Sequence, residues 1–177
     1  LAIGGNHLIH AARRNLDMTC LMLNNEVYGM TGGQASPVTS QDRLTTTTPA
    51  GNIEPAFDAC ALASAAGAGL VGREVTLQTP ALKNLIKEGL EYPGFAFLEV
   101  ISDCTEIYGR KNDLGESAEM ILSQKADMRP EAYHNTADQP FRPNNMETGV
   151  LERNERPEYG QRYRQHAAEL AAGAEND

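Results

Sequence analysis

The residues of this chain best suited to chemistry are two adjacent asparagines, Asn24 and Asn25, followed by a glycine-rich stretch over residues 29–33. The pair comes directly after an apolar run, residues 19–23, of a type that forms strands covered on both faces. Asparagine oxygens and exposed backbone carbonyls are hard ligands that suit Mg²⁺, which proteins often hold together with the phosphates of a substrate. The glycines permit positive φ and a close approach of the backbone to a ligand.

The same residues are also typical of a tight turn. Asparagine and glycine are both common in turns, because they tolerate backbone conformations that other residues avoid. Judged from the residues alone, the turn is the more frequent explanation of such a stretch, and the two interpretations stay open at this point.

Cys104 is the second residue that could do chemistry, because it closely follows an apolar run over 95–101. A thiolate at such a position suits iron and sulfur. A single cysteine after a strand is more often a small buried hydrophobic residue. The latter interpretation also applies to Cys20 and Cys60, which lie inside a predicted strand and a predicted helix.

Two histidines near the start of the chain, His7 and His10, invite a catalytic role, because imidazole is a common proton carrier in enzymes. On the alanine-rich beginning of a predicted helix, a structural histidine is the commoner case, more so for His10 than for His7.

Helices and strands alternate along the first two thirds of the chain. Strands are predicted at 19–23, 71–76 and 95–101. The predicted helices are 4–15, one starting at Glu54-Pro55 and running to 68, one starting at Thr79 as N-cap with Leu82, Leu85, Ile86 and Leu90 facing the core, and 115–122. This alternation favours a parallel sheet, whose strands end at one edge. Asn25 and Cys104 are therefore expected at the same edge.

Two segments do not follow this pattern. Residues 31–52 form a polar, threonine-rich connection that is longer than most and is typical of a functional or disordered loop. Beyond residue 126 proline and charge increase, which predicts an extended arm that orders on a partner. A last helix is predicted over 158–172, with Tyr159, Tyr163 and Leu170 contacting a neighbour. We therefore divide the chain into a domain at 1–125 and an arm with a terminal helix at 126–177.

Composition excludes several classes of protein. Hydrophobic residues make up 41% and charged residues 22%, as in ordinary globular domains. With 24 acidic and 15 basic residues the net charge is −9, which argues against nucleic-acid binding. No apolar run is long enough to cross a bilayer, so no membrane partner is expected. Three widely spaced cysteines do not suit a disulfide framework, which favours the cytoplasm.

Several segments together resemble the thiamine diphosphate enzymes, and more narrowly the β subunit of the 2-oxoacid:ferredoxin oxidoreductases. The family motif runs from Gly-Asp-Gly through a helix and a strand to a pair of asparagines. The segments that carry the resemblance are residues 3–7, 13–15, 23–34, 36–37 and 97–104, and those typical of the 2-oxoglutarate branch are 109–112 and 155–159.

The resemblance implies an α/β fold, a parallel sheet flanked by helices known as the thiamine diphosphate-binding fold, with an extended C-terminal arm. Residues 1–125 would be the C-terminal part of that domain. Because the chain begins just after the family position of Gly-Asp-Gly, the aspartate that ligates Mg²⁺ is expected upstream of Leu1. Three cysteines that ligate an iron–sulfur cluster are expected upstream as well.

The resemblance also assigns the cofactor site. The side-chain oxygen of Asn25 and the backbone carbonyl of Val27 would hold Mg²⁺, and Asn24 would brace the loop. Other positions implied to bind thiamine diphosphate are Gly4, Gly5, Asn6, His7, Gly29, Met30 and Thr31. The amides at the start of the first helix would face the diphosphate. No catalytic residue is assigned to this chain, since the activating glutamate of the family comes from the partner subunit and Glu26 is not given that role.

Cys104 matches the fourth ligand of the family's [4Fe–4S] cluster. The family's Ser-Pro-Cys is Ser102-Asp103-Cys104 here, which adds a carboxylate near the cluster position.

The implied activity is thiamine diphosphate-dependent oxidative decarboxylation of a 2-oxoacid, with 2-oxoglutarate expected, to its acyl-CoA. Ferredoxin would accept the electrons, coenzyme A the acyl group, and an α subunit would complete the pocket, so the isolated chain is expected to be inactive. Two alternatives stay open: a thiamine diphosphate decarboxylase or synthase without redox chemistry, and a non-catalytic assembly subunit that has kept the fold.

Overall fold

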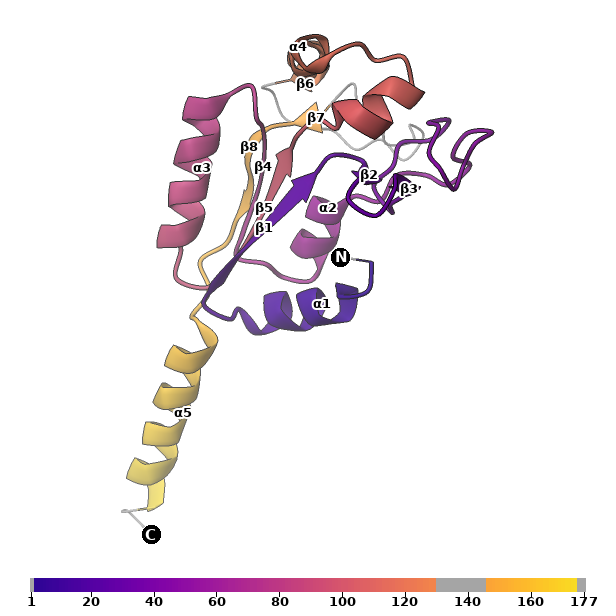
Figure 1. Ribbon diagram of the computed structural model, residues 1–177. Helices are drawn as coiled ribbons and strands as arrows, with labels where there is room; N and C mark the ends of the chain where they lie inside the picture. Colours follow the sequence, from indigo (N-terminus) through magenta and orange to yellow (C-terminus); the bar gives the residue numbers. More distant parts are fainter. Residues whose placement is uncertain (1, 130–145, 175–177) are drawn as a thin grey trace.

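The computed structural model describes residues 2–129 and 146–174, and its centre is a four-stranded sheet in the order β1-β5-β4-β8 (Figure 1). Strands β1 (Met18–Asn24), β5 (Phe95–Ile101) and β4 (Leu70–Val75) are parallel. Strand β8 (Gly149–Arg153) joins antiparallel to β4. The predicted α/β fold, a parallel sheet flanked by helices, is therefore confirmed, with β8 as an added antiparallel edge strand.

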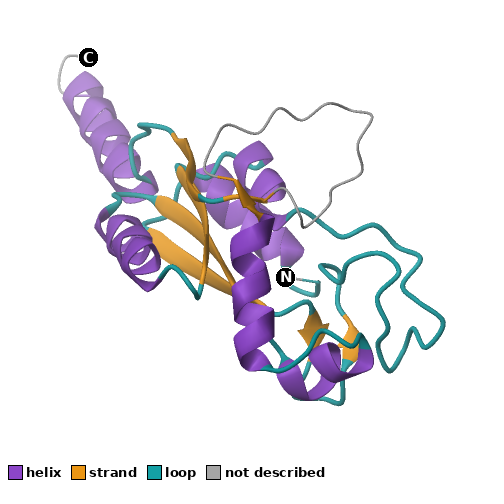
Figure 2. Ribbon diagram, turned by 90° about the horizontal axis from the view of Figure 1, so that it is seen from above, coloured by secondary structure: helices purple, strands orange, loops and turns teal. Residues whose placement is uncertain are grey.

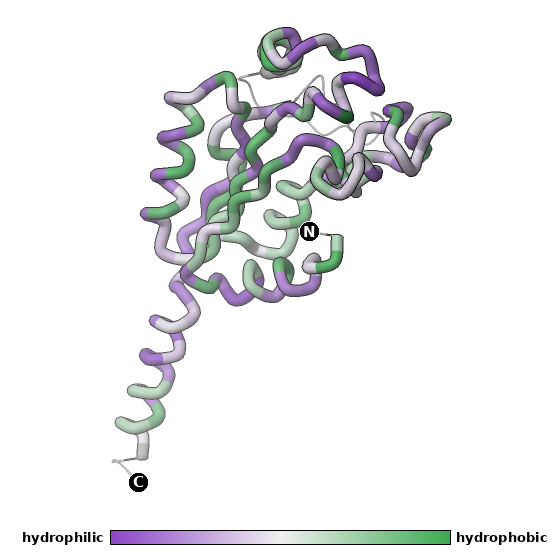
Figure 3. The backbone as a smooth tube through the Cα atoms, in the orientation of Figure 1, coloured by the Kyte–Doolittle hydropathy of each residue, from purple (hydrophilic) through white to green (hydrophobic). Residues whose placement is uncertain are grey.

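Helices cover the sheet from both sides (Figure 2). Helices α1 (Gly5–Arg14) and α2 (Ala59–Ala65) lie on one face, where Phe97 is fully buried. Helix α3 (Thr79–Glu91) lies on the other face and packs Leu85 against Leu98. Figure 3 shows the hydrophobic residues gathered along the strands and α2. The core consequently has two halves, one on each side of β4 and β5.

The carboxyl ends of the parallel strands meet at one edge. Asn24 on β1 lies opposite Ile101 on β5, which lies opposite Val75 on β4. Short elements gather beyond this edge (Figure 1): β2 (Val27–Tyr28), β3 (Gln34–Ala35), the π-helix η1 (Thr105–Gly109) and α4 (Ser117–Asp127). Strands β6 (Met128–Arg129) and β7 (Met146–Glu147) form a small parallel pair. The expectation that Asn25 and Cys104 follow strands ending at the same edge is confirmed.

Strand β1 differs from its prediction as a strand covered on both faces. Among the described residues β1 pairs only with β5, and its side chains Leu21 and Leu23 are 45% and 75% exposed. Helix α3 reaches only the beginning of the strand, where Thr19 Oγ1 donates to the Gly89 carbonyl at 2.8 Å. Beyond Thr19 that face of β1 is only partly covered in the described part of the chain, and its exposure increases from Leu21 to Leu23.

The starts of two helices also differ from prediction. Helix α2 begins at Ala59, not at Pro55, because the Asp58 carboxylate accepts the Ala61 N–H at 3.0 Å and caps the helix there. Ahead of the cap, Asn52 Nδ2 donates to the Glu54 carbonyl at 3.0 Å and holds that segment outside the helix. In α3 Thr79 is the first helical residue, with Gln78 as N-cap.

Within α3, Leu85 is buried and Ile86 packs against the core as predicted. Leu90 does not face the core, since it is 68% exposed and its neighbour Gly89 is buried instead.

The C-terminal region contains a strand that was not predicted. This strand, β8, pairs with β4 and lies inside the segment that was expected to be an extended arm. The predicted last helix is present as α5 (Tyr159–Ala174), which projects away from the sheet (Figure 1). Asn15 Nδ2 anchors its start by donating to the Arg156 and Pro157 carbonyls at 3.1 and 3.2 Å. Tyr163 and Leu170 are exposed on it, as is Tyr159. Contact of α5 with a partner and the division at residue 126 stay predictions, and residues 130–145 of the expected arm lie outside the described residues.

Among residues 2–129 and 146–174, no helix has the length and apolar character needed to cross a membrane.

A Gly89→Ala substitution is expected to lower the free energy of unfolding by about 1–3 kcal/mol, the usual cost of overpacking. The added methyl would lie 2.7 Å from Leu98 Cδ1, between α3 and the sheet. Urea unfolding measures the effect. Gly173→Ala in α5 is the matched control, since no atom lies within 4 Å of the added group. Equal stability of the two variants would contradict this packing.

Candidate cofactor-binding site

A small cavity of about 140 Å³ lies at the carboxyl edge of the sheet, and Asn25 and Val27 both line it. Ala2, just before α1, lines the same cavity, as does Pro37 from the long polar loop. The cavity therefore brings together the start of the chain and the asparagine pair, which are separated by the whole of α1 and β1.

The two asparagines have different surroundings. Asn24 is buried, its Nδ2 donates to Glu99 Oε1 at 2.8 Å, and its Oδ1 accepts the Glu26 N–H at 2.9 Å. Asn25 is half-buried, and its amide makes no hydrogen bond within the part of the chain whose side chains are described, residues 2–122 and 146–173. An amide oxygen without a partner that lines a cavity suits a hard cation. The donor set fits the prediction that Asn25 is a ligand and Asn24 a brace.

Glu26, which follows the pair, has a structural role in this loop. Its φ of 63° is unusual for a residue other than glycine. Its carboxylate accepts a hydrogen bond from the Tyr108 hydroxyl, and its carbonyl accepts one from Thr39 Oγ1. Burial, together with the nearby Glu26 charge, raises the pKa of Tyr108, so the phenol stays protonated and donates. Surrounding contacts thus hold a strained backbone conformation beside the cavity.

The glycine-rich stretch forms a hairpin between β2 and β3, so the turn interpretation holds for residues 29–33. Gly32 and Gly33 have φ of 116° and 83°, and the Gly33 N–H donates to the Tyr28 carbonyl at 2.9 Å. A methyl group at Gly33 would overlap Ile107 Cγ2. Glycine at this position therefore allows the hairpin to pack against η1.

Cys104 immediately precedes the π-helix η1. π-Helical turns are rare in proteins, and those that occur are often found at functional sites. Its side chain packs with Val27 and Tyr108. A methyl group at Gly29 would lie 3.5 Å from Cys104 Sγ. The structure thus places this thiol beside residues 24–29, which we call the asparagine loop. Within the described ranges no three His, Cys, Asp or Glu side chains are arranged to hold a metal ion, so Cys104 forms no cluster site there alone.

The start of α1 has room for a ligand. A Cβ on Gly4 or Gly5 would meet no atom within 4 Å, so internal packing does not require glycine at either position. Gly4 is the N-cap, and because glycine has no side chain it cannot cap the first amides of the helix. Asn6 and His7 follow it and are exposed. Uncapped amides at the start of a helix suit a diphosphate.

Of the predicted cofactor-binding positions, Asn25 and Val27 line the cavity, and its described lining does not include Gly4, Gly5, Asn6, His7, Gly29, Met30 or Thr31. Met30 is fully exposed, and Thr31 Oγ1 donates to Gln34 Oε1 at 2.6 Å. Contact of the residues outside this lining with a cofactor stays a prediction.

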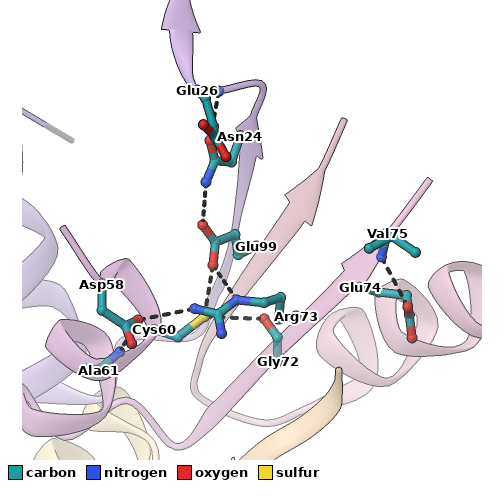
Figure 4. A network of polar contacts seen from close by, with 10 residues as sticks. All are labelled: Asn24, Glu26, Asp58, Cys60, Ala61, Gly72, Arg73, Glu74, Val75 and Glu99. Atoms are coloured by element: carbon teal, nitrogen blue, oxygen red, sulfur yellow. Dashed lines mark hydrogen bonds and ion pairs between the residues drawn. The ribbon is translucent and has the colours of Figure 1, made fainter. Parts of the chain in front are cut away.

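Sequence reasoning missed a buried polar network behind the asparagine pair (Figure 4). Arg73 Nε donates to Glu99 Oε2 at 2.6 Å, and its Nη2 donates to Asp58 Oδ1 at 3.1 Å. Cys60 Sγ donates to Glu99 Oε2 at 3.4 Å. The available signal was charge inside strands that are otherwise apolar, because Arg and Glu are rarely buried unless they are paired.

Residues 1–100 match the family described as thiamine pyrophosphate enzyme, C-terminal TPP binding domain, and the chain belongs to this family. Thiamine pyrophosphate is thiamine diphosphate, so this portion of the chain is a domain of the type that binds this cofactor.

More particular similarities agree with the predicted family. The chain is 50% identical over 120 residues to 2-oxoglutarate synthase subunit KorB of Methanocaldococcus jannaschii, covering 68% of this chain and 44% of that protein. It is 38% identical over 104 residues to 2-oxoacid:ferredoxin oxidoreductase 1, subunit beta, of Aeropyrum pernix, covering 59% of this chain and 33% of that protein. The chain thus spans less than half the length of these two relatives.

One solved structure with a similar fold is the 2-oxoglutarate:ferredoxin oxidoreductase from Magnetococcus marinus with 2-oxoglutarate, coenzyme A and succinyl-CoA bound. The TM-score is 0.78 at 25% identity, covering 96% of this chain and 58% of that one. The predicted resemblance to the β subunits of 2-oxoacid:ferredoxin oxidoreductases is therefore confirmed.

Proposed function

We propose that this chain is the cofactor-binding part of the β subunit of a 2-oxoglutarate:ferredoxin oxidoreductase. The assembled enzyme would convert 2-oxoglutarate and coenzyme A to the acyl-CoA and CO₂ and pass the electrons to ferredoxin. The observation that carries the proposal is the Asn25 amide beside Val27, which has no hydrogen-bond partner among the described residues and lines a cavity at the carboxyl edge of a thiamine pyrophosphate enzyme domain. The names of the relatives support the substrate class.

The residues present fit a magnesium-bound diphosphate. Asn25 would give its side-chain oxygen to Mg²⁺ and Val27 its carbonyl, while Gly4 and Gly5 leave space for the diphosphate at the start of α1. When bound, thiamine diphosphate supplies the electron-sink chemistry that decarboxylation of a 2-oxoacid needs. The role of this chain is to bind and orient that cofactor, with Asn24 and Glu26 fixing the loop that carries the ligands.

Electron transfer and assembly require groups beyond the described residues. We assign Cys104 as one thiolate ligand of a [4Fe–4S] cluster, because its sulfur lies beside the asparagine loop. An α subunit would supply the activating glutamate, and the exposed side of α5 suits contact with a partner. The three free cysteines suit a reducing cytoplasm.

The test uses the full-length protein co-expressed with its partner subunit. We expect reduction of a low-potential dye that depends on both 2-oxoglutarate and coenzyme A, with slower reduction when pyruvate replaces 2-oxoglutarate. Absence of dye reduction with any 2-oxoacid would refute the proposal. Release of CO₂ without dye reduction would favour the non-redox alternative, and absence of Mg²⁺-dependent thiamine diphosphate binding would favour the assembly subunit.

A further inference from the structure

We propose that Glu99 is a positioning residue for the metal-binding loop. Its buried carboxylate fixes the orientation of the Asn24 amide, and Asn24 in turn holds the loop that presents Asn25 and Val27. This inference rests on the proposed function, which it deepens by assigning a role to a residue that lies outside the cavity.

Glu99 connects the sheet to the loop through its two oxygens. Oε2 accepts from Arg73 Nε at 2.6 Å and from Cys60 Sγ at 3.4 Å, while Oε1 accepts from Asn24 Nδ2 at 2.8 Å (Figure 4). Glu99 and Arg73 are only 3% and 5% exposed. A carboxylate this deeply buried needs a paired cation and further hydrogen bonds, and this one has both.

The surroundings of Glu99 leave its Oε1 as an acceptor. Arg73 provides the opposite charge, and burial raises the pKa of Cys60, so that thiol remains a donor to Oε2. An ionised carboxylate only accepts hydrogen bonds. Whichever group lies opposite Oε1 must therefore donate.

This requirement sets the orientation of the Asn24 amide. Its NH₂ group lies toward Glu99, so its oxygen lies toward the backbone N–H of Glu26, 2.9 Å away. A rotated amide would place two acceptors together at Glu99 and two donors together at Glu26. Each buried group left without a partner in this way has lost its hydrogen bond to water and gained none in return, which disfavours the rotated amide. The negative charge of Glu99 thus selects one of the two amide orientations.

The hydrogen bond from Glu26 to Asn24 matters because Glu26 has a φ of 63°. A non-glycine residue keeps this conformation only where its surroundings hold it. Asn25 lies between the two bonded residues and makes no hydrogen bond of its own to the described residues, and Val27 follows directly. The placement of both ligands therefore depends on the contact that Glu99 orients.

Asp58 offers a matched comparison at the other end of the same network. It pairs with Arg73 at 3.1 Å and caps α2 by accepting the Ala61 N–H at 3.0 Å. Removing its charge disturbs the Arg73 pairing and the cap, while the hydrogen bonds of Asn24 to Glu99 and Glu26 stay in place.

The experiment titrates thiamine diphosphate into the full-length protein with its partner subunit at a series of Mg²⁺ concentrations, by calorimetry. We expect Glu99→Gln and Asn24→Ala each to raise the Mg²⁺ concentration for half-saturation by about 10–100-fold, as for other residues that orient metal ligands. At saturating Mg²⁺, affinity for the cofactor and kcat should approach wild type. Asp58→Asn should lower the melting temperature and leave the Mg²⁺ requirement unchanged. The Glu99→Gln and Asn24→Ala double variant should match the single variants, because the two residues act in series.

An unchanged Mg²⁺ requirement in Glu99→Gln, beside normal binding by wild type, would overturn this inference alone. So would an equal shift in Asp58→Asn, because it would indicate general destabilisation. If Glu99→Gln does not fold, Glu99→Asp takes its place, because it keeps the negative charge for Arg73 and shortens the side chain away from Asn24. An unchanged Mg²⁺ requirement in that variant would also overturn the inference. Wild-type protein that binds no cofactor in the presence of Mg²⁺ would overturn the proposed function and this inference with it.

Discussion

Replacing Asn25 with alanine is expected to abolish useful binding of thiamine diphosphate, with the Mg²⁺ requirement raised by at least about 100-fold. Residues that merely orient a ligand already cost 10–100-fold when removed, and Asn25 is assigned as a ligand itself. Its amide lines the cavity and is not needed for a hydrogen bond within the described residues. Because no such contact is lost, the stability of the fold should change little.

Calorimetric titration of the full-length protein with its partner subunit measures this effect. Asn25→Asp keeps an oxygen ligand at the same position and should retain binding, since carboxylates suit Mg²⁺. Asn84→Ala is the matched control, because Asn84 is an exposed asparagine on α3. Wild-type cofactor affinity in Asn25→Ala at low Mg²⁺ would remove Asn25 from the site.

Replacing Cys104 with serine is expected to eliminate dye reduction and the visible absorbance of the cluster, while thiamine diphosphate binding persists. Serine keeps the size of the side chain, but its hydroxyl is a poor ligand for iron–sulfur clusters, which require thiolates. Cys104 packs against Val27 in a small cluster that an isosteric side chain can also fill. Electron output and cofactor binding should therefore separate in this variant.

Absorbance spectra and the dye assay, with calorimetry for the cofactor, check this separation. Cys20→Ser is the matched control, since Cys20 is a half-buried thiol inside β1 and is assigned no ligand role. Retention of brown absorbance and electron output by Cys104→Ser would favour the alternative without iron–sulfur chemistry.

The order of the main elements could be predicted from the sequence because their signals are local. The apolar run at 95–101 coincides with β5, and the helix expected from Thr79 is α3. The start of α2 could not be predicted in the same way. Pro55 is a good first-turn residue, but the hydrogen bonds of Asn52 hold the chain ahead of it in another conformation, and the cap falls at Asp58.

Strand β8 shows a second limit of local signals. It contains only two consecutive large apolar residues, Val150 and Leu151, so it lacks the alternation typical of a strand. It forms because β4 offers a free edge, and β4 lies far away in the sequence. Pairing over such a separation depends on tertiary structure and leaves no mark in the short segment itself.

In the candidate site, too, the features that depend on neighbouring residues could be predicted and those that depend on distant residues could not. The asparagine pair could be recognised because its residues are adjacent and follow a strand. The network behind it could not, since Arg73 and Glu99 lie on different strands, 26 positions apart, and become partners only when β4 and β5 pair. The sequence shows a charged residue inside each of these apolar strands, which is unusual. It does not show that the two residues are partners, because that depends on how the strands pair in the sheet.

The position of β1 at an edge of the sheet has a practical consequence for handling this protein. In the described part of the chain, one edge of this strand has no neighbouring strand, and Leu21 and Leu23 add apolar surface beside it. Exposed edges of this kind accept strands from other molecules and lead to aggregation. A preparation containing only these residues will therefore tend to self-associate, and turbidity or a broad elution profile would reflect an open sheet edge in a correctly folded domain.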